Sequence, residues 1–329
     1  MLDEIFIKIK QLYNISNLKL IKNLGGFSSL NFQISDSSNQ FVLKQYRNST
    51  ADKIKQIEKI SFFLDQSDIP VKLPILNKNG SYHFVYQDTL YALYPMVEGI
   101  ILHENTLSQK ALHSASNILA QLHRLIPIAE LNLHDANTCL VNYDEVSDEA
   151  NKVLNLIANN PISEETDNIT RNLIYLKLSL LNDLSAFNFN NVLQPKYLVH
   201  GDFHNENIIF SAGHQVIKLL DFEHTFIGSR TEDIFEFIHK GCCNSGFDEE
   251  NINKAKHFLS HYKSVFPISN DELYIGFQYS VYQLVSSFFF EKELYTSHDI
   301  SLYGLIGRDI NRLSYINDHS RAIFNCIIF

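Results

Sequence analysis

Two polar segments, each joined directly to an apolar run, hold the side chains of this sequence that are best suited to chemistry. The first is His200–Asn207, which lies between the apolar runs 197–199 and 208–210. The second is Asp221–Glu223, which ends the apolar run 216–220. The first segment contains two His, one Asp, one Glu and two Asn, which add nothing to the stability of a buried hairpin. Polar loops of this kind are typical of functional sites.

The apolar runs that flank these segments read as strands, with the clearest ones at 197–200, 207–210 and 216–220. Adjacent strands would bring four oxygen-bearing side chains together, namely Asp202, Asn207, Asp221 and Glu223. Carboxylate and amide oxygens are hard ligands that suit Mg²⁺ and do not suit zinc. The pattern therefore predicts a magnesium site.

The spacing of these residues resembles a known catalytic signature. His-x-Asp-x-x-x-x-Asn followed by Asp-Phe-Glu is similar to the signature of the aminoglycoside phosphotransferase and choline kinase family, which has a protein-kinase-like fold. Arg230 and Asp233 follow at a spacing similar to that of choline and ethanolamine kinases, whereas Gly201 resembles the aminoglycoside phosphotransferases. The strong motifs cover residues 197–240, and weaker ones extend back to residue 18.

The resemblance implies a role for each residue in a transfer that depends on positioning and on charge neutralisation. Asp202 would orient the acceptor hydroxyl and take its proton. His200 would brace the loop, and Asp233 would anchor it by hydrogen bonds. The implied metal ligands are Asn207 and Asp221, with Glu223 assisting a second ion.

The amino-terminal part of the chain is expected to bind the nucleotide. Lys44 shares a strand face with Val42 and Tyr46, and a lysine on an apolar face is costly unless it has anionic partners. By the resemblance it would reach the α and β phosphates, with Glu58 of the following helix as its partner. Backbone N–H groups of a small, flexible segment would cover the phosphates, and the chain crossing to the second lobe would bind adenine. The expected contacts are Gly25, Gly26, Phe27, Ser28 and Ser29 in the segment, and Tyr94, Met96 and Glu98 in the crossing.

The surrounding pattern predicts an α+β, bilobal, protein-kinase-like fold. A small lobe of about five antiparallel strands with one helix after the third spans residues 1–97, including a hairpin of 73–76 with 81–86. Residues 98–329 form a larger, mainly helical lobe that holds the catalytic and substrate-binding residues. Its helical patterns lie at 107–125, 145–160, 164–186, 231–240, 250–264 and 271–292.

The composition and net charge limit the classes of molecule that this protein is expected to bind. The 329 residues carry a formal net charge of −10, which argues against nucleic acid or an anionic membrane as a partner. No run approaches the roughly 18 apolar residues of a membrane span, and we expect a cytoplasmic protein. The expected cofactors are ATP, with GTP left open, and Mg²⁺. The expected partner is a small-molecule hydroxyl acceptor of aminoglycoside, choline, ethanolamine or homoserine type.

Other functions stay open at this point. A catalytically inactive kinase-like module would lack one of Lys44, Asp202, Asn207 or Asp221, and all four are present. A metal-dependent phosphohydrolase would need further His-rich segments. A protein kinase would carry Arg in place of Gly201 and an Ala-Pro-Glu element after Asp-Phe-Glu.

Overall fold

The structure, a computed structural model, describes residues 2–26, 29–47, 49–127, 131–134, 142–185, 189 and 196–328. It divides into two compact units. The first comprises Met1–Ile101, Pro127–Asn132 and Asn207–Glu223, and the second comprises Leu102–Ile126, Leu133–Glu206 and His224–Phe329. The sequence predicted two continuous lobes, whereas here the hairpin that carries Asn207 and Asp221 belongs to the first unit.

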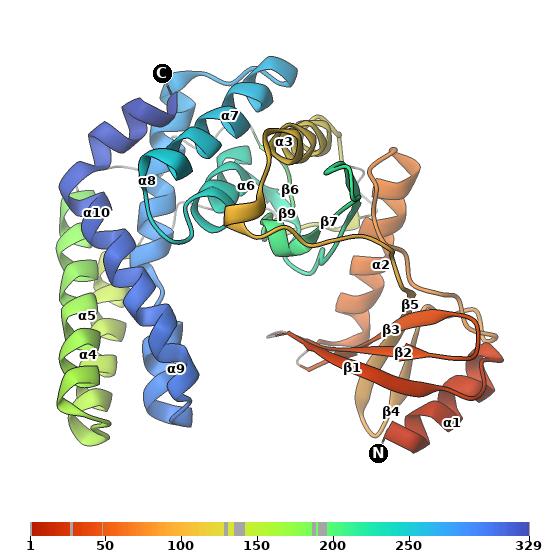
Figure 1. Cartoon of the computed structure of the whole chain (residues 1–329). Coiled ribbons are helices and arrows are strands. Elements are labelled where there is room, and N and C mark those ends of the chain that lie inside the picture. Colours follow the sequence, from red (N-terminus) through yellow and green to blue (C-terminus); the bar gives the residue numbers. More distant parts are fainter. Residues whose placement is uncertain are drawn as a thin grey trace. The chain divides into compact units, whose positions relative to one another are not determined.

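The first unit is built on an antiparallel sheet of five strands in the order β1-β2-β3-β5-β4 (Figure 1). The strands are β1 (Lys19–Gly25), β2 (Ser29–Ser35), β3 (Gln40–Tyr46), β4 (His83–Tyr86) and β5 (Thr89–Pro95). One helix, α2 (Ala51–Gln66), follows the third strand, as predicted. Thr50 caps the N-terminus of α2, and its side chain accepts a hydrogen bond from the Lys53 N–H.

The predicted hairpin of 73–76 with 81–86 is wrong. The hairpin joins β4 to β5 instead, and its turn residues Gln87 and Asp88 have φ values of 47° and 60°. This left-handed pair matches the twist of two antiparallel strands, so it sets the register of the hairpin. Residues 73–76 contribute only isolated contacts, such as the hydrogen bond from the Ile75 N–H to the Leu93 carbonyl.

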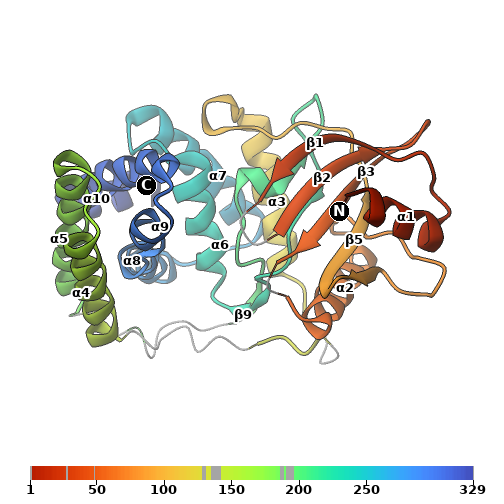
Figure 2. The same ribbon diagram turned by 90° about the horizontal axis from the view of Figure 1, so that it is seen from below.

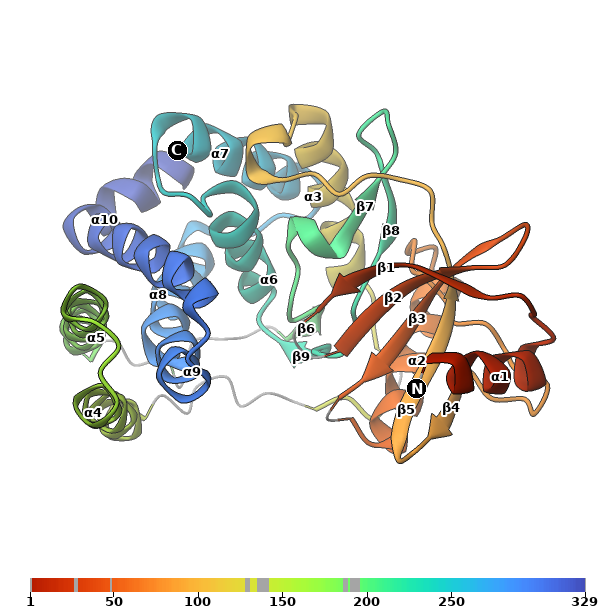
Figure 3. The same ribbon diagram turned by 60° about the horizontal axis from the view of Figure 1, so that its bottom comes forward.

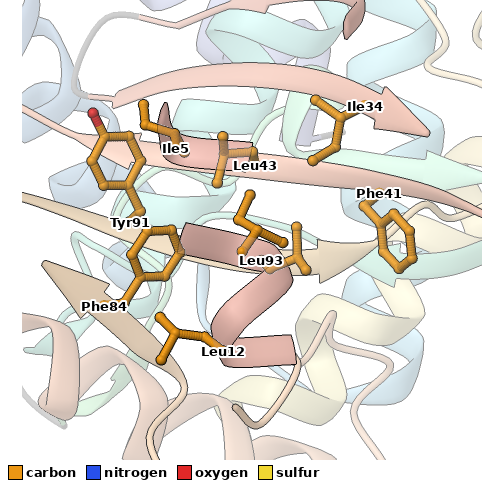
Figure 4. Packing of buried hydrophobic residues seen from close by; sticks show 9 residues of the cluster. Ile5, Leu12, Ile34, Phe41, Leu43, Phe84, Tyr91 and Leu93 are labelled. Atoms are coloured by element: carbon orange, nitrogen blue, oxygen red, sulfur yellow. The ribbon is translucent and has the colours of Figure 1, made fainter. Parts of the chain in front are cut away.

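Each face of the sheet is covered by one helix. Phe41 and Leu43 of β3 belong to a buried cluster with Ile5 of α1 (Leu2–Tyr13), which is drawn in Figure 4. On the opposite face, Tyr46 packs with Ile54 of α2. Because side chains alternate along a strand, Lys44 lies on the α2 face (Figure 3 shows the sheet).

A second hairpin completes the first unit. β7 (Ile208–Phe210) pairs with β8 (Val216–Leu219), as the sequence predicted. Backbone bridges tie Leu219 to Val71 and Phe210 to Ile100. These contacts fix the end of β8, and therefore Asp221, within the same unit as Lys44.

The second unit is mainly helical. Its helices are α3 (Gln109–His123), α4 (Tyr143–Asn159), α5 (Glu164–Leu184), α6 (Arg230–Glu236), α7 (Glu249–Val265), α8 (Asn270–Ser286), α9 (Phe289–Ser297) and α10 (Tyr303–Ile328). Figures 1 and 2 show α4 and α5 side by side, with α10 next to α5. A short strand, β6 (Tyr197–Val199), pairs with β9 (Phe226–Gly228). None of the helices in the described part of the chain is long and apolar enough to cross a membrane.

Three features of this unit differ from the predicted pattern. The predicted helix 271–292 is two helices, because the chain leaves helical geometry at Ser287. The helix α10 and the strand β9 were not predicted. A π-helical turn, η5 (Phe237–Cys242), continues α6. Such turns are rare and occur frequently at functional sites.

Candidate active site

In the first unit, Lys44 is held by two carboxylates. Its Nζ lies 2.5 Å from Oε1 of Glu223 and 3.3 Å from Oδ1 of Asp221. Only 12% of the Lys44 side chain is exposed. Burial lowers the pKa of Lys44, but the charges of Asp221 and Glu223 outweigh this effect and leave the pKa above its ordinary value. The lysine is therefore a fixed cation.

Local backbone geometry brings these residues together. The N–H of Leu220 donates to the carbonyl of Asn207 over 2.9 Å, so the start of β7 lies beside the end of β8. The next residue, Asp221, has a φ of 61°, which is uncommon for a residue with a side chain. Backbone strain of this kind is concentrated at functional sites. Asn207, Asp221 and Glu223 therefore lie in the unit that also holds Lys44.

The predicted pairing of Lys44 with Glu58 is wrong. Glu58 Oε1 lies 2.8 Å from Nδ1 of His83, with which it forms a salt bridge if the histidine is protonated. The reason is the strand order, since β5 lies between Lys44 on β3 and His83 on β4. Glu58 of α2 therefore meets the sheet two strands away, about 10 Å from the lysine strand.

A second lysine of the first unit was missed by the sequence prediction. Lys72 Nζ lies 5.3 Å from the ring centroid of Tyr94, whose hydroxyl lies 3.1 Å from that of Tyr46. Burial, and then the charge of Lys44, lowers the pKa of Lys72 to about 8. The sequence signal was weak, because Lys72 stands beside Pro70 and Pro74 and outside any regular pattern.

The predicted phosphate-covering segment is described in part. Gly25 and Gly26 have φ values of 77° and 124°, and a Cβ on Gly26 would lie 2.2 Å from the Ser29 carbonyl oxygen. Both glycines are therefore required by the backbone path. Phe27 and Ser28 lie outside the described residues.

The predicted adenine-binding crossing begins at the end of β5. Met96 donates its backbone N–H to the Gln40 carbonyl over 3.0 Å, so this donor is already used within the sheet. Glu98 is exposed. An adenine ring bound here would have to form hydrogen bonds with other backbone groups of the crossing.

The oxygen ligands of the first unit suit magnesium. Within the described residues, no group of three or more His, Cys, Asp or Glu side chains is placed to hold a metal ion. The predicted set contains the two carboxylates and the amide of Asn207. Mg²⁺ usually binds one or two carboxylates and completes its shell with water and substrate phosphates. Because both carboxylates already converge on the cation of Lys44, they fit an ion that binds together with a nucleotide.

In the second unit, the loop with Asp202 is fastened by Asp233. Asp233 is fully buried and accepts hydrogen bonds from the backbone N–H groups of His200, at 2.7 Å, and Gly201, at 2.9 Å. Nε2 of His123 lies 3.0 Å from the same carboxylate, and Nδ1 of His123 lies 2.8 Å from the Tyr262 hydroxyl. The contact of His123 with this anchor was not predicted from the sequence.

Gly201 is required at its position. Its φ is 81°, and a Cβ there would lie 2.2 Å from the carbonyl oxygen of His224. Any side chain at this position would push the loop away from the backbone of His224, which precedes β9. The replacement of the protein-kinase Arg by Gly thus has a local structural reason.

Asp202 is surrounded by basic groups. Its Oδ1 lies 3.3 Å from Nε2 of His204 and 3.3 Å from Nζ of Lys240. Burial raises the pKa of Asp202, but the hydrogen bond from His204 and the charges of Lys240 and both histidines lower it more. The pKa of Asp202 therefore lies well below its ordinary value, and the carboxylate is ionised at neutral pH.

Lys240 was not predicted as a site residue. It belongs to η5 and forms a second ion pair with Glu236, one turn earlier. The available signal was the spacing of four residues between Glu236 and Lys240, which reads as an ordinary surface pair on a helix. Only the fold shows that this lysine contacts Asp202.

The anchoring contact gives a first testable prediction. Replacing Asp233 with Asn leaves the side-chain shape but sets an NH₂ group against backbone donors, so we expect a loss of about 1–3 kcal/mol in unfolding free energy. We also expect kcat to fall at least about tenfold, because Asp202 loses its position. Denaturant unfolding and steady-state kinetics measure the two effects. The exposed Asp183→Asn variant on α5 serves as the control, and equal behaviour of both variants would contradict the anchoring role.

Comparison with known proteins agrees with this architecture. Residues 19–250 match the family described as "Phosphotransferase enzyme family". No curated protein matches the sequence closely enough to count as a relative. The match covers more than half of the chain, so the chain belongs to this family and is a small-molecule kinase by class.

Solved structures show the same fold at low sequence identity. The spectinomycin phosphotransferase APH(9)-Ia, solved with ADP and spectinomycin, has a TM-score of 0.64 at 14% identity, covering 99% of this chain and 93% of its own. An aminoglycoside phosphotransferase from Alicyclobacillus acidocaldarius has a TM-score of 0.58 at 11% identity, covering 95% and 96%. A microcompartment-associated aminopropanol kinase has a TM-score of 0.57 at 16% identity, covering 94% and 99%. The predicted protein-kinase-like fold class is confirmed.

Proposed function

We propose that this chain transfers the γ-phosphoryl group of ATP, with Mg²⁺, to a hydroxyl group of a small molecule. The observation that carries the proposal is the buried Lys44, held by Asp221 and Glu223. A buried cation bound by two carboxylates suits a site that takes up a polyanion together with a metal ion. The family and the ADP bound to APH(9)-Ia support a nucleotide as that polyanion.

Each residue then has a role. Lys44 contacts the nucleotide phosphates, and the carboxylates that hold it keep it charged in the absence of a nucleotide. Asp202 orients the acceptor hydroxyl and accepts its proton as the new O–P bond forms. Asp233 and His123 keep the loop of Asp202 in place. His200 contributes its backbone N–H to that anchor, and no step requires its side chain to react.

The metal ion would be held by Asp221, Glu223 and Asn207. When bound, it neutralises charge on the phosphates and aligns them for transfer. The positive φ of Asp221 sets the direction in which its side chain leaves the backbone, and its Oδ1 lies 3.3 Å from Nζ of Lys44.

The proposal is tested by ATP consumption with Mg²⁺ across aminoglycosides, amino alcohols, hydroxy acids and sugars. We expect turnover with at least one class of alcohol, and GTP in parallel decides the nucleotide. Replacing Lys44 with Met is expected to lower kcat/KM by at least about 100-fold, since a preorganised charge contact to the phosphates is lost.

The control is Lys59→Met, an exposed lysine on α2. It should keep kcat/KM within about twofold of the unaltered protein, as is usual for exposed positions. Nucleotide binding without turnover for any alcohol would contradict the kinase proposal and favour an inactive kinase-like module.

A further inference from the structure

Buried polar atoms without a hydrogen-bond partner are concentrated where α6, η5, α8 and α10 meet. The described residues contain seven such side-chain atoms, and four of them are in this region. They are Glu232 Oε1, His239 Nδ1, Arg308 Nε and Arg312 Nε. Buried polar groups in native proteins are nearly always paired, so this concentration indicates a place for a ligand or for water. We call these residues, with Glu236, Lys240 and Asp309, the α10 cluster.

Two of the three carboxyl groups of the α10 cluster, Glu236 and Asp309, already have cationic partners. Lys240 pairs with Glu236 and with Asp202. Arg312, which is 6% exposed, donates to Oδ1 of Asp309 over 2.8 Å. Glu232 is the remaining carboxyl group of the α10 cluster, and no ion pair involves it among the described residues.

Glu232 adds no negative charge at neutral pH. Burial, followed by the charge of Asp233, raises the pKa of Glu232 to about 8. Its Oε2 accepts a hydrogen bond from Gln283 over 3.2 Å. A protonated Glu232 cannot attract an ammonium group.

His239 is neutral and has a defined tautomer. Ser280 donates its hydroxyl to the Phe277 carbonyl over 2.7 Å, so its oxygen must accept from Nε2 of His239, 3.0 Å away. Burial, followed by the charge of Arg312, lowers the pKa of His239 to about 3. Its Nδ1 is an acceptor, which one water shared with the Nε–H of Arg312 would satisfy.

Arg308 remains as the cation without a counter-ion. Within the described part of the chain it forms no ion pair, and its buried Nε–H has no acceptor. It lies one turn before Arg312 on α10, and the two guanidinium groups repel each other. A buried or half-buried guanidinium in this situation is stabilised by an anion.

We infer that the acceptor carries an anionic group, a carboxylate or a phosphate, and that Arg308 and Lys240 recognise it. This inference rests on the proposed function and adds the class of acceptor. Lys240 is the member of the α10 cluster that contacts Asp202, and 44% of its side chain is exposed, so a ligand can reach it. An ammonium group next to the reacting hydroxyl would meet this lysine and be repelled.

The charges near Asp202 and the net charge of the whole chain favour ligands of opposite charge. A formal charge of −10 favours cationic molecules at long range. Contacts within a few ångströms, screened less by salt, decide which molecule fits at Asp202. The basic groups that lower the pKa of that carboxylate are His204, Lys240 and His200.

The test compares alcohols of similar size and opposite charge. Suitable pairs are 3-hydroxypropanoate with 3-aminopropan-1-ol, and gluconate with glucamine; glycerol 3-phosphate adds a phosphate arm. We expect the anionic member of a pair to have the higher kcat/KM, by about 100-fold. The opposite preference would overturn the inference while leaving the proposed kinase activity intact.

Variants of Arg308 test whether this residue contacts the anionic group of the acceptor. Arg308→Met is expected to raise KM for the anionic alcohol about 10- to 100-fold and to leave kcat and the KM for ATP within twofold, because it removes ground-state binding. Arg308→Lys should recover part of the loss. Arg321→Met makes the same change at an exposed position of α10 and should have no effect.

Thermal unfolding gives a readout that does not depend on turnover. Removing an uncompensated cation should leave the melting temperature of Arg308→Met unchanged or higher. Anionic probes at 10–50 mM, about the concentration needed for millimolar binding, should stabilise the unaltered protein more than this variant. The inference is contradicted if the anionic alcohols are not phosphorylated and if they stabilise the unaltered protein no more than the Arg308→Met variant. The proposed function fails separately, if no alcohol of either charge is phosphorylated.

Discussion

Replacing Asp202 with Asn is expected to lower kcat about a thousandfold, while the KM for the nucleotide changes little. The amide cannot take the proton of the acceptor hydroxyl. Its NH₂ group would also face donors, because Nε2 of His204 and Nζ of Lys240 both lie 3.3 Å from Oδ1 of Asp202. Steady-state kinetics and nucleotide titration separate the effect on transfer from the effect on binding.

Glu206→Gln is the matched control for this variant. Glu206 belongs to the same loop, is exposed, and undergoes the same change from carboxylate to amide. It should retain most of the activity. A kcat for Asp202→Asn close to that of the control would show that the transfer does not use this carboxylate.

The low pKa of Asp202 also predicts how kcat depends on pH. Because the folded-state pKa lies below the ordinary value, the carboxylate stays ionised as the pH falls from 7 to 5. Asp202 therefore contributes no loss of kcat in that range. Removing the charge of Lys240, as in Lys240→Met, should move the acid limb of the pH–rate profile towards neutral pH.

The second large effect concerns stability. Replacing Lys177 with Met is expected to lower the free energy of unfolding by about 3–5 kcal/mol, since it leaves a buried carboxylate without a partner. Lys177, 3% exposed, pairs with Glu291 and donates to the Ser287 carbonyl over 2.6 Å. These contacts join α5 to the junction between α8 and α9. Urea unfolding measures the loss.

Two further variants make this prediction specific. The double variant Lys177→Met with Glu291→Leu should recover most of the lost stability, because no buried charge then remains. Lys152→Met removes an exposed lysine that pairs with Glu149 and should cost no more than about 1 kcal/mol. If Lys177→Met cost as little as Lys152→Met, the buried pair would not stabilise the unit.

The sequence predicted the features that depend on local order along the chain. The strands at β7 and β8 and the polar residues that follow them could be placed because apolar runs with polar ends have few other readings. The same holds for the helix after β3. The family resemblance then supplied roles, and the anchoring contacts of Asp233 are those that its role requires.

The features that were missed depend on packing. Glu58 was assigned to Lys44 by helical position alone, whereas the order of β3, β5 and β4 places it beside His83. Lys177 and Lys240 read as solvent-exposed lysines until the fold supplies their carboxylate partners. Spacing along the chain carries no information about such contacts.

The hydrogen bonds at Asp233 have a thermodynamic consequence for ligand binding. The N–H groups of His200 and Gly201 already have their acceptor in this carboxylate, which Nε2 of His123 also contacts. A molecule that binds at Asp202 therefore finds a loop whose order was established during folding. Its affinity is not reduced by the entropy of ordering that backbone, so even an acceptor with few atoms can bind in a productive geometry.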